Sequence, residues 1–162
     1  MWTTTTYRVG LGQPGGVEGL MRESIKRAFA YMMGQKVRIG VGQQVDTTDF
    51  HVEAIDLLSN HVPCEAGIAF VVALYSALKR SPVQAGIVIL GDLSIQGNIK
   101  HQANAVSGEP LQVAMDNGAR KALIPLENKR NFLEVSGDIV ERVDPVFFSD
   151  PMTAAMKALG MT

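Results

Sequence analysis

The sequence is short of several features that would each point to a class of protein. It has a single cysteine, Cys64, in 162 residues. That count excludes an internal disulfide and argues against a cysteine-rich metal site. It is typical of a protein from a reducing compartment, so we expect a cytoplasmic location. The sequence also contains no Gly-x-x-x-x-Gly-Lys-Ser/Thr phosphate-binding loop, so these residues do not supply an ATPase of that type.

Long hydrophobic runs and a charge excess are missing too. The longest uncharged apolar run, residues 66–78, has 13 residues, whereas a membrane-spanning helix needs about 20. The first residues lack the basic and apolar regions of a signal peptide, and we expect no membrane partner. The net charge of −1 does not indicate a strongly basic nucleic-acid binder or an acidic tail. Basic pairs at 79–80, 120–121 and 129–130 leave a local patch for DNA open.

The residues that are present have the pattern of a globular domain. Hydrophobic residues make up 46% of the chain and charged residues 19%, which is ordinary for a folded domain. We expect one domain over residues 1–162, because this length can enclose a hydrophobic core. Helical spacing of apolar residues, with end signals, predicts helices at 17–33, 65–80, 109–117, 127–133 and 151–159. The first ends at Gly34, and the second is apolar on all sides and therefore buried.

Strands are predicted where apolar residues alternate or cluster without helical spacing. These segments are 7–11, 37–41, 50–57, 83–90, 93–99, 121–125 and 138–143. Because Gly91-Asp92 is typical of a hairpin turn, we expect 83–90 to pair antiparallel with 93–99. Strands and helices are mixed but do not alternate strictly. The predicted class is therefore α+β, with small mixed sheets and helices packed around the central helix.

Candidate catalytic or metal-binding residues lie at the beginning of this central helix, where a polar turn precedes it. The first amide groups of a helix are unpaired and its dipole is positive there, so a reactive group is often placed at such a point. Cys64 could be a thiolate nucleophile. Glu65 with His61 could bind zinc. His51 and Glu53, on one face of a predicted strand, could bind a metal or could form the solvent side of that strand. Alternatively, Glu65 neutralises the helix dipole and accepts amide hydrogen bonds, which is worth about 0.5–1 kcal/mol and needs no catalysis.

Four segments resemble the peptidase domain of the Lon proteases. They are Gly-Leu-Met-Arg-Glu-Ser-Ile at 19–25, Ala-Gly-Ile-Ala at 66–69, Gly-Asp-Leu-Ser-Ile-Gln-Gly at 91–97, and Gly118 with Lys-Ala-Leu-Ile-Pro and Glu-Asn-Lys-Arg at 121–130. Their order and spacing match the family over most of the chain. The resemblance implies the Lon peptidase-domain fold. It also implies descent from ATP-dependent peptidases that use a serine nucleophile and a lysine base.

The chain departs from the family at both catalytic positions. The family serine directly precedes Ala-Gly-Ile, and Glu65 stands there in this sequence. A carboxylate cannot form the ester intermediate of that chemistry. Gly108 falls closest to the lysine position, and no lysine occurs between Lys100 and Lys121. Cys64, the fallback nucleophile, is one position early, which turns its side chain about 100° around a helix.

The resemblance is closest to the Lon-like domains that end AAA+ proteins of bacteriophage-exclusion systems. It implies an assembly or interaction module that has lost the Ser-Lys dyad. The domain would form a ring, a hexamer, with itself, and ATP would be bound by an AAA+ ATPase in the same or a partner chain. We expect no cofactor and no metal in this domain, and DNA is a possible partner through the full-length protein. The alternative is an ATP-dependent Lon-type endopeptidase with an unusual active site.

Overall fold

The structure, a computed structural model, describes residues 19–50, 52, 65–100 and 108–161. The predicted strand at 7–11 and nearly all of the one at 50–57 lie outside these ranges. Within them, no helix is both long and apolar enough to cross a membrane.

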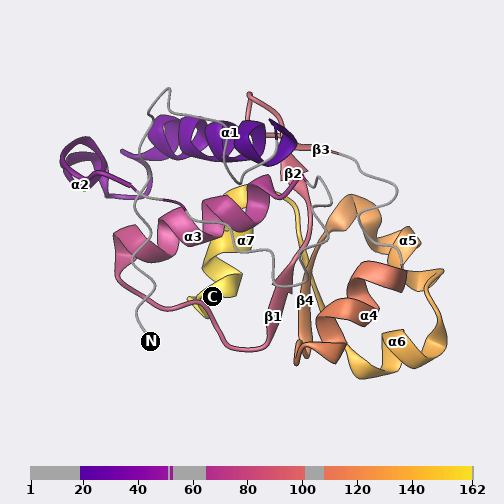
Figure 1. Cartoon of the computed structure of the whole chain (residues 1–162). Helices are drawn as coiled ribbons and strands as arrows, with labels where there is room; N and C mark the ends of the chain where they lie inside the picture. Colours follow the sequence, from indigo (N-terminus) through magenta and orange to yellow (C-terminus); the bar gives the residue numbers. More distant parts are fainter. Residues whose placement is uncertain (1–18, 51, 53–64, 101–107, 162) are drawn as a thin grey trace.

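A parallel three-stranded sheet divides the fold into two halves (Figure 1). Its strand order is β1 (Ile87–Ile89), β4 (Lys121–Pro125) and β5 (Asp144–Phe148). Along β4, Leu123 belongs to one hydrophobic cluster, whereas Ala122 and Ile124 belong to another. Because neighbouring side chains of a strand point to opposite faces, the sheet is covered on both sides.

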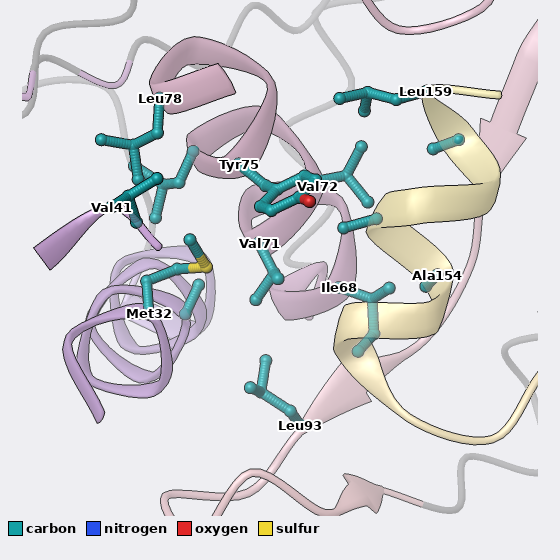
Figure 2. Close-up of a cluster of buried hydrophobic side chains, with 14 of the residues drawn as sticks. Met32, Val41, Ile68, Val71, Val72, Tyr75, Leu78, Leu93, Ala154 and Leu159 are labelled. Carbon is teal, nitrogen blue, oxygen red and sulfur yellow. The ribbon is translucent and has the colours of Figure 1, made fainter. Parts of the chain in front are cut away.

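The first cluster is organised by α3 (Gly67–Lys79). This helix lies between α1 (Gly19–Gln35) and α7 (Pro151–Ala158), and α2 (Gly42–Thr47) follows α1 (Figure 1). Figure 2 shows Met32 of α1 on one side of α3 and Ala154 of α7 on the other. Ile68 and Val71 of α3 are fully buried between them, and each such side chain contributes about 1.5–3 kcal/mol.

The second cluster covers the other face of the sheet. It is enclosed by α4 (Gly108–Asp116), the short 3-10 helix η1 (Leu126–Asn128), α5 (Lys129–Leu133) and α6 (Gly137–Arg142). Phe132, Leu111 and Ile124 are its largest fully buried side chains. The Phe132 ring meets the Phe147 ring of β5 edge to face, with centroids 6.1 Å apart.

A small antiparallel hairpin, β2 (Asp92–Leu93) and β3 (Ile99–Lys100), follows β1. It corrects the predicted pairing: β1 does not pair with this hairpin but runs parallel to β4. Gly91, interpreted as a hairpin turn, instead links the sheet to the hairpin at a φ of +111°. A Cβ atom there would lie 2.8 Å from Cγ of Pro125, so the close approach requires glycine.

The α+β class and the buried central helix are confirmed, as are the helices near 17–33, 109–117, 127–133 and 151–159. Three other predictions were wrong. Residues 138–142 lie in α6 and not in a strand, residues 37–40 form turns, and α1 continues through Gly34 to Gln35. Strand β5 was not predicted at all.

Candidate functional site

The beginning of α3 is held by two buried side chains from distant parts of the chain. Asp92 Oδ1 accepts a hydrogen bond from the Gly67 amide at 2.9 Å, and Ser24 Oγ accepts one from the Ala66 amide at 3.3 Å. Ser24 also donates to Asp92 Oδ1 at 3.3 Å. Both Ser24 and Asp92 are fully buried. They therefore satisfy two amides that a helix start leaves unpaired.

Two cations and a second carboxylate complete this arrangement. Arg27 donates to Asp92 Oδ2 at 2.7 Å and to Glu65 Oε1 at 3.3 Å. Lys100 Nζ donates to the same Glu65 oxygen at 2.7 Å and lies 3.3 Å from Asp92 Oδ2. We call Ser24, Arg27, Glu65, Asp92 and Lys100 the Asp92 cluster. Its two negative and two positive charges balance, which offsets part of the cost of burying them.

Exposure increases outward through the Asp92 cluster. The side chain of Asp92 is 0% exposed, that of Arg27 15%, that of Glu65 23% and that of Lys100 36%. The hydrogen bond to Glu65 is the largest effect on the pKa of Lys100 and raises it; burial opposes this effect, and Asp92 adds to it. The raised pKa keeps Lys100 an ammonium ion at neutral pH.

Three local features bring these residues together. Ser24 and Arg27 are three residues apart on α1 and so share one helix face. The β2–β3 pairing places Asp92 directly opposite Lys100. At Gly67, an added Cβ would collide with Asp92 Oδ1 and with the Leu93 side chain. The absence of a side chain at Gly67 is therefore what lets β2 approach the helix start.

Comparison with known proteins assigns this chain to a family. Residues 3–159 match the model of the Lon protease (S16) C-terminal proteolytic domain. The chain belongs to this family. It is 28% identical over 140 residues, 86% of this chain, to the Lon-like protease BrxL of Escherichia coli O9:H4 (strain HS). It is 31% identical over 139 residues, 84% of this chain, to the Lon protease of Buchnera aphidicola subsp. Schizaphis graminum (strain Sg).

These two matches cover 20% of the BrxL protein and 17% of the Buchnera Lon protease. The chain thus spans no more than about a fifth of the length of the curated relatives it matches. It corresponds to one domain of those proteins, and the activity of a whole relative does not pass to it by similarity alone.

In this Lon domain, Glu65 is the one member of the Asp92 cluster that was predicted as a site residue from the sequence. The other four members were not predicted. Arg27 was not singled out in the sequence, and its side chain is mostly buried. Asp92 was interpreted as part of a turn, and no role was predicted for Lys100. A signal was present in Ser24 and Asp92, because both fall in segments that carry the family resemblance.

One interpretation of Glu65 was that it accepts hydrogen bonds from the first amides of the helix. The Ala66 amide instead donates to Ser24, and the Gly67 amide donates to Asp92. Gly108, at the predicted lysine position, is the first residue of α4. Cys64 and the three histidines of the chain, His51, His61 and His101, lie outside the described residues, as does Glu53. The fallback nucleophile Cys64 and the two metal-binding alternatives therefore remain untested. Among the described residues, no three His, Cys, Asp or Glu side chains are grouped to hold a metal.

Each basic pair of this Lon domain has a lysine engaged within the chain. Lys79 Nζ donates to the Ile39 carbonyl at 2.8 Å, and Lys121 Nζ to Gln84 Oε1 at 3.2 Å. Lys129 Nζ lies 5.7 Å from the centroid of the Phe147 ring. These contacts give the three lysines structural roles beside any attraction to nucleic acid.

Proposed function

We propose that this chain is a Lon-like domain without a working Ser-Lys dyad, which serves as an assembly and interaction module. The observation that carries the proposal is the pairing of the Glu65 carboxylate with two cations. This residue directly precedes Ala66-Gly67, and its carboxylate is bound by Lys100 at 2.7 Å and by Arg27 at 3.3 Å. Both contacts are charge-assisted hydrogen bonds, and they occupy the carboxylate oxygen Oε1. The carboxylate also cannot form the ester intermediate that a serine provides.

The amine in the site supports the same proposal. A lysine that acts as a general base must lose its proton near the working pH. Lys100 has its pKa raised by Glu65 and Asp92, so it holds its proton at neutral pH. Gly108, nearest to the family's lysine position, has no side chain to offer.

The proposed module belongs to an ATP-driven bacteriophage-defence protein. The similarity to the Lon-like protease BrxL of E. coli supports this choice. In this proposal ATP is bound by an AAA+ ATPase in the same or a partner chain, the domains form a hexameric ring in the cytoplasm, and any DNA contact is made by the full-length protein. The Asp92 cluster would keep α1, α3 and the β2–β3 hairpin in fixed positions within each subunit. Native mass spectrometry of the full-length protein tests the ring directly.

A second candidate is an ATP-dependent endopeptidase with an unusual active site. Two observations favour it. The relatives include proteins named proteases, and Lys100 lies beside the residue that follows Cys64 in the sequence. In this alternative Cys64 is the nucleophile.

A casein-cleavage assay on the full-length protein separates the two functions. Wild type, Cys64→Ala and Glu65→Ala are each incubated with casein, with and without ATP. The proposed module gives no cleavage above the buffer control in any of the three. Cleavage by the wild type that is lost in Cys64→Ala or in Glu65→Ala would establish the endopeptidase and refute the module.

A further inference from the structure

The inner part of the Asp92 cluster is held together without Glu65. Asp92 accepts from the Gly67 amide, from Ser24 and from Arg27, and none of these bonds involves the Glu65 side chain. The first turn of α3 is therefore held by two fully buried side chains, Ser24 and Asp92. Glu65 forms the outer part of the cluster, where its side chain remains 23% exposed.

The charges around Glu65 indicate what its carboxylate does there. Without that carboxylate, Arg27 and Lys100 would share Asp92 as their one acidic partner in the cluster, leaving a net charge of about +1 at the positive end of a helix. Arg27 also has a hydrogen-bond donor to spare: its buried Nε–H has no acceptor among the described residues. An excess of positive charge with free donors favours a carboxylate.

We propose that Arg27 and Lys100 form a carboxylate-binding site, which the chain's own Glu65 fills. The ligand is a carboxylate small enough to replace the Glu65 head group, carried by an acidic side chain or by the C-terminus of a peptide. Lys100 is 36% exposed, so a carboxylate can reach it from solvent once Glu65 is displaced or removed. This inference concerns the same residues as the proposed function but rests on their charges and contacts, and it holds whether or not the protein cleaves peptides.

Rescue of a Glu65→Ala variant of the protein by added carboxylate tests the site. Thermal unfolding is measured in sodium formate and in sodium chloride at equal ionic strength. We expect formate to raise the melting temperature of Glu65→Ala by about 2–4 °C more than chloride does, with the concentration dependence of binding to one site. Wild type and Glu65→Gln, whose side chains fill the space, should respond equally to the two salts.

Two further arms define the site and its ligand. Adding Lys100→Met to Glu65→Ala should abolish the difference between formate and chloride. N-acetylalanine, which carries a terminal carboxylate, and the α-amide of N-acetylglutamate, which carries a side-chain carboxylate, show which source fits better.

The proposal is overturned if formate acts like chloride on Glu65→Ala, or if the double variant keeps the full gain. It is also overturned if Glu65→Ala does not fold with or without formate, because the anchor through Asp92 is required to survive without Glu65. None of these outcomes depends on casein cleavage, so this inference and the proposed function can fail separately.

Discussion

Asp92 Oδ1 accepts the amide hydrogen of Gly67 at 2.9 Å, joining the first strand of the hairpin to the first residue of the central helix. The other oxygen of the same carboxylate binds Arg27 at 2.7 Å. Asp92 thereby connects α1, α3 and the hairpin from a fully buried position.

Replacing Asp92 with alanine should destabilise the protein strongly. The change leaves the Gly67 amide without its acceptor and removes the closest acidic partner of Arg27, and breaking a buried ion pair in this way costs about 3–5 kcal/mol. The free energy of unfolding in urea measures the loss. Asp46→Ala is the matched control, because the Asp46 side chain is 51% exposed in its pair with Lys36 and should contribute less than about 1 kcal/mol. Equal losses in the two variants would show that Asp92 does not anchor the start of α3.

Gly67→Ala should also destabilise the protein, although alanine is the better helix former. The added methyl group would collide with Asp92 Oδ1 and the Leu93 side chain, and forced overpacking of this kind costs roughly 1–3 kcal/mol. Gly34 of α1 is the control, because nothing lies within 4 Å of the position that a Cβ atom would take there. Gly34→Ala should stabilise by about 0.5–1 kcal/mol. A stabilising Gly67→Ala would mean that β2 does not approach the helix as closely as it does here.

The raised pKa of Lys100 predicts a loss of stability in alkali. A lysine whose pKa is higher in the folded than in the unfolded state binds its proton more tightly when folded. Its contribution is complete below the unfolded value of about 10.5 and is lost as the pH rises through the higher folded value. Urea unfolding at pH 9 to 12 should therefore show a smaller alkaline loss for Lys100→Met than for wild type. Tyr31 also has a raised pKa, caused first by burial, so the comparison is best made in a Tyr31→Phe background. Identical slopes for the two proteins would contradict the pairing of Lys100.

The long helices could be predicted from the sequence because the spacing of their apolar residues fits a helix and not a strand. Residues 138–143 show where this fails. Ile139, Val140 and Val143 are β-branched and favour a strand, yet their spacing of one and three residues also fits one face of a helix. The structure forms α6 there, with the Ile139 and Val140 amides bonded to the Ser136 carbonyl. Strand β5 was missed because it contains Pro145, which a sheet tolerates at its edge.

The candidate site could be predicted only in part, for a different reason. Glu65 was found because it directly precedes a recognisable segment. Its partners Arg27 and Lys100 lie 38 and 35 residues away in the sequence, and no local pattern connects them. The pairing of β2 with β3, which brings Lys100 opposite Asp92, depends on the hairpin that was assigned to the wrong strands.

The pairing of Glu65 with Lys100 is the contact on which the proposed function most depends. A double-mutant cycle with Glu65→Gln, Lys100→Met and the combined variant, each measured by urea unfolding, isolates the energy of this pair. Because both side chains are partly exposed, we predict a favourable coupling of about 0.5–1 kcal/mol. A coupling of zero, or one of opposite sign, would show that Glu65 is not held as a paired carboxylate at the position where the sequence resemblance predicts the nucleophile.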